Sequence, residues 1–347
     1  MANIRDVAKA ASVSISTVSS VLKGNKFVSD KLVKRIMQAV EEVGYVPENR
    51  TAHLFPRKNV AVILPGIYSS FFSPMISGID DVASSHNFDV ILYDSHRDFT
   101  RERELMRMLK KRNIRNIIVD SVCSLKDEPA YMQELRETMI AAKDFNIVMV
   151  EREIKDEDFY SIYVDNFKAS YQITKHLISQ GRRKIAHISG AEQFPHVQIR
   201  AEGYRKAMED AGLSVEDRRL LKGDFTPLSG FGATKELLNK GINVDGIFAA
   251  NDQMAIGAIK AIREFGLKVP QDIAVAGFDN LKIASLVTPS VTTIQYPVYQ
   301  MGFQAMQIIA KLEKGQKVDP KTELKTRLFV RQSSDETVPE DWDLQRW

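Results

Sequence analysis

Two groups of side chains in this chain are of types that could do chemistry. One is a set of hydroxyls near the N-terminus, within the stretch ASVSISTVSSVLKG, and the other is a set of polar residues that directly follow apolar runs. Neither group has the spacing of a known catalytic or metal-binding motif. The chain contains no HExxH and no GxSxG, no glycine-rich phosphate loop follows a strand pattern, and its six histidines show no metal-ligand spacing. Carboxylates, amides and hydroxyls without a paired nucleophile and base indicate binding, so we expect no enzymatic activity, no cofactor and no metal.

The hydroxyl-rich stretch alternates with period two, which is typical of a half-buried strand. Its neighbours favour another structure. Asn3 and Asp6 predict a capping box at a helix over Ile4–Ala11, and Ser29 and Gly44 predict the two ends of a helix over Asp30–Val43. A lone strand between two helices would have no pairing partner, so the middle segment is predicted to be helical as well.

The middle helix is predicted from about Ser16 to Lys23, after a turn at Ser12–Ser14, with Ser14 as its cap. A helix, a three-residue turn and a second helix form a helix-turn-helix. The outward residues at the start of the second helix would enter the major groove of DNA. These residues are Ile15, Ser16 and Ser20.

The charge distribution supports a nucleic-acid partner for this end. Residues 1–58 hold ten Lys and Arg against five Asp and Glu, whereas the whole chain has a net charge of only +3. A basic end on a neutral or slightly acidic remainder is typical of a nucleic-acid-binding module, although a merely solvated basic face remains an alternative. No apolar run approaches the ~20 residues of a membrane span and no signal peptide is visible, so we expect a soluble, cytoplasmic protein with no membrane partner.

From Asn59 onward, apolar runs alternate with helical patterns. Runs such as Val60–Leu64, Ile117–Val119 and Ile247–Ala249 suit buried parallel strands, which predicts a doubly wound α/β body. About two sets of βα units predict two lobes with a cleft between them. Ligands of such folds bind beyond the carboxyl ends of strands. The residues just after the apolar runs are therefore binding candidates: Asp165, Gly190, Asn251 and Asp279.

The motifs also carry a family resemblance. IRDVAKAASVSISTVSSVL and Gly44-Tyr45-Val46-Pro47, followed by AANDQMAIGA, VPQDIAVAGFDN and VRQSS, together resemble the LacI/GalR (lac/purine repressor) family over almost the whole chain. The resemblance implies a homodimeric transcription regulator with a helix-turn-helix head and a body like periplasmic sugar-binding proteins. It implies a pseudo-palindromic double-stranded operator as the DNA partner. Repression is expected from family habit, and the sequence does not decide between an inducing and a corepressing effector.

The resemblance implies roles for individual DNA-contacting residues. Ile15, Ser16 and Ser20 match base-reading positions, and Thr17 and Tyr45 match phosphate-contacting positions. Leu54 matches the leucine that is inserted into the minor groove. Many relatives have Arg, or in the purine type His, where this chain has Ser20, so we expect a weaker or different base preference there.

The same resemblance implies an effector cleft. The residues that match its ligand-contacting pattern are Phe71, Phe72, Asp165, Arg200, Phe225, Asn251 and Asp279. Carboxylates, an amide and aromatic faces suit a polyol, so a small sugar or sugar derivative is predicted. The purine-binding type has Arg and Thr at the positions of Phe194 and His196, whose presence here argues against a purine. Local roles stay open, because Asp165 and Asn251 could simply cap helices, Arg200 could form an ion pair, and Phe71 and Phe72 could pack at a helix start.

The predicted organisation has three parts. These are a helix-turn-helix domain (1–46), a hinge segment (47–58) and a body (59–347). Within the body we predict an N-lobe of about 59–162 and 291–323, a C-lobe of about 163–290 and 324–335, and a polar tail (336–347). The tail has no leucine heptads, which favours a dimer over a tetramer. Alternatives to a sugar-controlled regulator of carbohydrate use are control by a protein partner, as in catabolite-control members, control by a non-sugar metabolite, and an enzyme or sugar carrier that shares the body.

Overall fold

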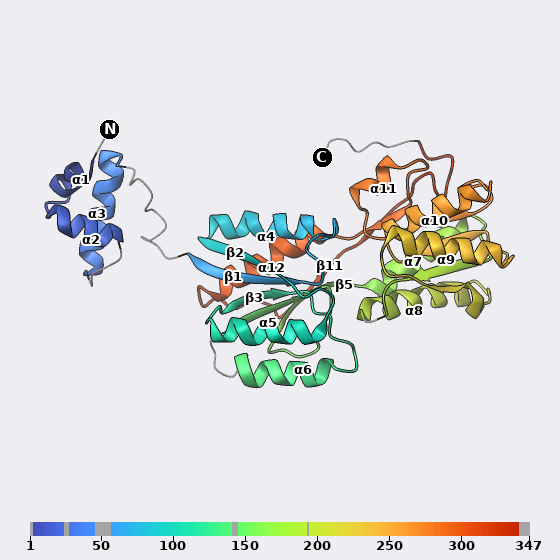
Figure 1. Cartoon of the computed structure of the whole chain (residues 1–347), viewed down its shortest axis with the longest axis horizontal. Helices are drawn as coiled ribbons and strands as arrows, with labels where there is room; N and C mark the ends of the chain where they lie inside the picture. Colours follow the sequence, from blue (N-terminus) through green and yellow to red (C-terminus); the bar gives the residue numbers. More distant parts are fainter. Residues whose placement is uncertain (1–2, 24–27, 46–56, 141–144, 193, 340–347) are drawn as a thin grey trace. The chain divides into compact units, whose positions relative to one another are not determined.

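The computed structural model describes residues 3–23, 28–45, 57–140, 145–192 and 194–339, in a small N-terminal unit and a large unit that begins at Asn59 (Figure 1). We call the small unit the head and the large unit the body. The predicted hinge falls almost entirely on residues 46–56, outside the described residues. Among the described residues, no helix combines the length and the apolar character of a membrane-spanning segment.

The head is a bundle of three helices, α1 (Ile4–Ala10), α2 (Ile15–Lys23) and α3 (Asp30–Val43). Its core is a cluster of small and branched apolar side chains that includes Val7, Val18 and Ile36, all fully buried. The stretch that alternates with period two is therefore helical, as predicted, because packing on two neighbouring helices outweighs its strand-like pattern.

The ends of the head helices follow local chemistry. Asn3 and Asp6 form the predicted capping box, with each side chain accepting from the other residue's backbone N–H. Ser14 Oγ accepts from the N–H of Thr17 at 3.1 Å, and Gly44 ends α3 at a φ of 62°. The prediction for Ser29 is wrong in one respect. Ser29 occupies the N-cap position of α3, but its hydroxyl makes no capping hydrogen bond within the described part of the chain.

The first lobe of the body is built on a parallel sheet with strand order β11-β5-β4-β3-β1-β2. Helices α4 and α12 cover one face and α5 and α6 the other (Figure 1). The strands are β1 (Lys58–Leu64), β2 (Phe88–Asp94), β3 (Asn116–Val119), β4 (Asn146–Val150), β5 (Tyr160–Val164) and β11 (Lys321–Leu324). The helices are α4 (Ser73–Ser85), α5 (Phe99–Lys111), α6 (Glu128–Leu135) and α12 (Val298–Leu312).

The second lobe has a four-stranded parallel sheet in the order β7-β6-β8-β9. Helices α7 and α8 pack together on one face, and α9 and α10 pack together on the other. The strands are β6 (Ile185–Ser189), β7 (Leu220–Lys222), β8 (Gly246–Ala249) and β9 (Ala274–Ala276). The helices are α7 (Asn166–Ser179), α8 (Pro195–Asp210), α9 (Pro227–Asn239), α10 (Asp252–Glu264) and the short α11 (Lys282–Leu286). The chain thus has the predicted helix-turn-helix head and the predicted doubly wound α/β body.

The chain crosses between the lobes after β5, after β10 (Thr293–Gln295) and after β11. Strand β10 pairs with β12 (Arg327–Phe329), and its end is bridged to Asp279 beyond β9. This pairing associates β10 with the second lobe, whereas the predicted boundary at residue 291 assigned it to the first. A strand of three residues has too short a hydrophobic pattern to indicate which sheet it joins. Its hydrogen-bonded partner in the structure identifies the sheet.

Candidate functional site

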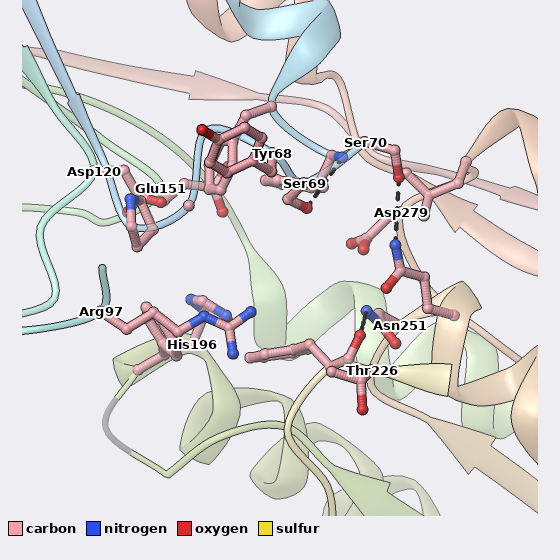
Figure 2. A pocket seen from close by; sticks show the side chains of 18 of the residues that line it. Tyr68, Ser69, Ser70, Arg97, Asp120, Glu151, His196, Thr226, Asn251 and Asp279 are labelled. Carbon is pink, nitrogen blue, oxygen red and sulfur yellow. Dashed lines mark hydrogen bonds between the residues drawn. The ribbon is translucent and has the colours of Figure 1, made fainter. Parts of the chain in front are cut away.

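A cavity of about 490 Å³ lies between the carboxyl ends of the strands of the two lobes (Figure 2). This volume lies within the range of small-molecule sites. The polar and aromatic side chains in the cavity wall include Phe71, Phe72, Arg97, Asp120, Glu151, Phe194, His196, Arg200, Phe225, Asn251 and Asp279. All of them belong to the body.

Arg200 on α8 is the most firmly held charge in the cavity wall. Its side chain is 2% exposed, and its guanidinium stacks on the ring of Phe278 at 3.8 Å from the centroid. Nε donates to Oδ1 of Asn166 at 2.8 Å and Nη1 donates to the carbonyl of Ala250 at 2.7 Å. Nη1 also lies 3.8 Å from a carboxylate oxygen of Asp279. A buried cation held in this way presents a fixed charge to a ligand.

Asn251 links the start of α10 to the cavity wall. Its Oδ1 accepts from the N–H of Met254 at 2.9 Å, and its Nδ2 donates to the carbonyl of Phe225 at 3.0 Å. Asn251 therefore caps a helix and also positions Phe225, whose ring lines the cavity. The Phe225 ring lies so close to Gly190 that a Cβ there would overlap it. Gly190, which the sequence marked only by its place after a strand, thus makes room for that ring.

Backbone strain concentrates in the cavity wall. Glu151, Phe225 and Asp279 have φ angles of 72°, 71° and 101°. Residues with a side chain seldom adopt this left-handed conformation, and such strain is often found at ligand sites because the surrounding structure must maintain it. Each of the three aims a functional side chain at the same space.

Aromatic rings line two sides of the cavity. Phe71 and Phe72 stand edge to face, with centroids 5.0 Å apart, where the loop after β1 leads into α4. On the opposite side, the Phe194 ring lies 5.5 Å from His196 and 5.8 Å from Phe225. Aromatic faces of this kind pack against the C–H surface of a small ligand, while the polar groups select its orientation.

Burial controls the protonation of the cavity's polar groups. It raises the pKa of the Glu151 carboxyl to about 7, although Arg200 and Tyr296 act against the rise. Burial raises the pKa of Asp120 well above its usual value, and the neighbouring Glu151 adds to this effect. Burial also lowers the pKa of His196 well below its usual value, so this ring stays neutral. Burial therefore disfavours the charged forms of Asp120 and Glu151, and a nearby cation would favour them.

In the head, the start of α2 presents a small, nearly uncharged surface. Ile15 is 45% exposed and Ser16 is exposed, whereas Thr17 and Ser20 are half-buried. The hydroxyl of Ser14 lies 2.7 Å from those of both Ser16 and Thr17. Val18, directly behind this surface, is fully buried and fixes the helix to the bundle.

Known proteins match both units. The model of bacterial regulatory proteins of the lacI family matches residues 3–48, and that of a periplasmic binding protein-like domain matches residues 174–334. An HTH-type transcriptional regulator RegA from Clostridium saccharobutylicum is 33% identical over 336 residues, which is 96% of this chain and 99% of that protein. The chain belongs to the lacI family of bacterial regulatory proteins.

Two further relatives show the range of lacI family members that this chain is similar to. Catabolite control protein A of Priestia megaterium is 31% identical, covering 95% of this chain and 98% of that protein. The structure of a transcriptional regulator CelR–cellobiose complex is 28% identical with a TM-score of 0.70, covering 96% of this chain and 100% of that one. The chain is therefore a DNA-binding transcriptional regulator whose body contains a cavity of a size that suits a small molecule.

Most of the effector-site residues expected of a lacI family member lie around one cavity: Phe71, Phe72, Arg200, Phe225, Asn251 and Asp279. Asp165 does not line this cavity. It is exposed and its Oδ1 accepts from the N–H of Lys168 at 2.8 Å, so it caps α7. It lines an adjoining cavity of about 460 Å³, whose wall also includes Asp120, Glu151 and His196. The next residue, Asn166, lines that second cavity too and contacts the first through its bond to Arg200.

Sequence reasoning missed two acidic residues of the cavity. Asp120 follows β3 and Glu151 follows β4, so each stands directly after an apolar run, the signal that selected Asn251 and Asp279. The same rule applied to the first lobe would have found them. Arg97 and His196 gave no such signal, because neither directly follows a strand in the sequence. Folding brings both side chains to the cavity.

Two expected DNA-contacting residues of this lacI family chain fall outside α2 in the sequence. Tyr45 is half-buried against the apolar cluster of the head, so part of its ring serves packing. Leu54 lies outside the described residues.

Proposed function

We propose that this regulator represses genes of carbohydrate use and that a small sugar or sugar derivative in the body cavity controls its binding to DNA. The observation that carries the proposal is the cavity itself. It combines aromatic walls with a fixed guanidinium, an amide and carboxyls, which are the groups that recognise a hydroxylated ring. The CelR complex with cellobiose, a similar protein of the same family, supports a sugar of this class.

The proposed DNA contacts are made by the head. Ile15, Ser16 and Ser20 read bases, Thr17 and Tyr45 bind phosphates, and Leu54 inserts into the minor groove. The exposure of Ile15 and Ser16 at the start of α2 supports the first assignment. Two copies of the chain bind a pseudo-palindromic operator with half-sites about one helical turn apart.

The proposed mechanism couples the two activities through closure of the lobes. Two side-chain hydrogen bonds already join them, from Arg97 to the Asp224 carbonyl at 3.2 Å and from Gln253 to Ser70 Oγ at 3.3 Å. An effector that binds the closed body more tightly shifts the population towards it and changes operator affinity by the same coupling free energy. The chain acts by binding alone and catalyses no reaction.

Selection of bound sites from random DNA, followed by a gel shift in the presence of a panel of sugars, tests the proposal. We expect an enriched two-fold symmetric site and at least one sugar that changes its affinity. Asn251→Ala and Arg200→Ala should abolish the response to the sugar. A selected site whose affinity no sugar alters would contradict effector control, and failure to select any symmetric site would contradict operator binding.

A further inference from the structure

Two carboxyls stand together at one end of the cavity, where Figure 2 shows Asp120 and Glu151 apart from Asn251 and Thr226. Their strands, β3 and β4, are neighbours in the parallel sheet, so their carboxyl ends meet at one edge. Both side chains are about 5% exposed. They also line an adjoining cavity of about 460 Å³, together with His196, so they form part of the wall between two spaces that a ligand can occupy.

The nearby cations are already engaged by other groups. Arg152 donates to Glu128 at 2.9 Å and to the carbonyls of Ser121 and Cys123. Arg200 is held by Asn166, Ala250 and Asp279, as described above. Oε1 of Glu151 is fully buried and receives no hydrogen bond of ordinary geometry from the described residues. The buried hydroxyl of Tyr296 faces this carboxyl and acts to lower its pKa, so it is the one protein donor that a ligand would join there among the described residues.

A buried carboxylate oxygen with too few donors is costly, and the charge of Asp120 beside Glu151 adds to the cost because two carboxylates repel each other. Glu151 also has a left-handed backbone conformation, of a kind that often occurs at ligand sites. A ligand group that supplies several donors and a positive charge would satisfy both carboxyls at once. A protonated amine has three N–H donors and no acceptor, whereas a phosphate or carboxylate would be repelled.

We infer that the effector carries a protonated amine, as an amino sugar does, and that Asp120 and Glu151 bind this ammonium group. The inference rests on the proposed function, because the ring of the ligand would occupy the polyol-binding part of the cavity near Arg200 and Asn251. Asp279 is paired with Arg200 and therefore contacts hydroxyls instead of the amine. The amine is thus what distinguishes the true effector from neutral sugars of the same shape.

Titration calorimetry of the full chain at pH 7.5 with matched ligands tests the inference. The ligands are glucosamine, galactosamine and mannosamine, each beside its parent hexose and its N-acetyl derivative, which keeps the ring and removes the charge. We expect one amino sugar to bind at least tenfold more tightly than both of its neutral counterparts. Glu151→Gln and Asp120→Asn should each reduce that preference at least tenfold while binding of the neutral sugar persists.

Glu236→Gln is the matched control, since it removes a carboxylate from the exposed face of α9, where Glu236 pairs with Lys240. It should leave the preference unchanged, and thermal unfolding confirms that each variant is folded. Equal binding of a hexose and its amino form overturns the inference and leaves the proposed function standing. Absence of binding by every member of the panel overturns the inference, while the gel shift with a wider panel of sugars decides the proposed function separately.

Discussion

At the scale of single residues, the small side chains of α2 are the groups that we propose to read DNA bases. Ser20 is half-buried beside the exposed Ile15 and Ser16, and it offers one hydroxyl where a guanidinium could form two parallel bonds to guanine. The head therefore has little charge directed at base edges. Affinity must come largely from phosphate contacts, which makes binding strongly dependent on salt.

Ser20→Arg should create a preference for guanine at one position of each half-site, of about 1–3 kcal/mol. Selection of sites from random DNA with the wild type and the variant measures this change. Gln38→Arg adds the same charge on the exposed face of α3 and should strengthen binding without altering the site. An identical site for wild type and Ser20→Arg would show that this residue does not face a base.

The carboxyl of Glu151 makes stability depend on pH. Burial raises its pKa to about 7 from a value near 4.5 in the unfolded chain, with Asp120, Arg200 and Tyr296 facing it in the folded body. The folded state therefore binds this proton more tightly. The resulting stability is fully present below pH 4.5 and is lost as the pH rises through 7.

Glu151→Gln should therefore stabilise the chain at pH 8, by up to about 3 kcal/mol, and have little effect at pH 5. Chemical unfolding of both proteins across this pH range gives the comparison. A difference between them that does not grow with pH would show that Glu151 is not held in its protonated form.

At the scale of elements, close backbone contact between helices builds the lobes. In the first lobe, α4 and α12 approach each other at two glycines. A Cβ on Gly302 would overlap the carbonyl oxygen of Met75, and a Cβ on Gly78 would overlap that of Tyr299. Because α4 also follows the loop that carries Phe71, this contact positions one wall of the cavity.

Gly302→Ala should destabilise the chain by about 1–3 kcal/mol, because backbone must move to admit the methyl group. Gly232→Ala in α9 is the control, since a Cβ there meets nothing within 4 Å and the substitution should stabilise its helix by up to about 1 kcal/mol. Thermal unfolding of the two variants measures both effects. If Gly302→Ala were no more destabilising than Gly232→Ala, the backbones of α4 and α12 would not be in close contact at Gly302.

At the scale of the whole body, the proposed effector control depends on contacts between the two lobes. The bond between Gln253 and Ser70 is one of these, at 3.3 Å, and it lies at the mouth of the cavity. This bond is exposed to solvent, so we expect it to contribute only modestly to the free energy of effector binding.

Ser70→Ala, Gln253→Ala and the double variant should each bind the effector about 3- to 10-fold more weakly. Because both single variants lose the same bond, the double variant should be no weaker than either, which a double-mutant cycle measures. Additive losses would show that the two side chains act separately. If a variant loses effector affinity because its lobes close less readily, the effector should also change the operator affinity by a smaller factor.

The order of the elements could be predicted from the sequence alone, and so could most of the polar residues that follow strands. Capping residues such as Asn3, Asp6 and Gly44 act within one turn of the chain, so their effect can be recognised locally. The apolar runs likewise identify buried parallel strands, and a strand's end identifies the edge at which ligands bind. Asn251 and Asp279 were found in this way.

Which of those polar residues face one another depends on how distant elements pack together. The tertiary structure separated Asp165, a helix cap, from Asn166, which holds Arg200, and it brought Asp120 and Glu151 together from different βα units. It also showed that Arg200 is buried, although its helix has a largely polar face in the sequence. The physical reason is that side-chain direction and burial depend on packing between elements far apart in the chain, whereas helix caps and strand patterns depend on neighbours only a few residues away.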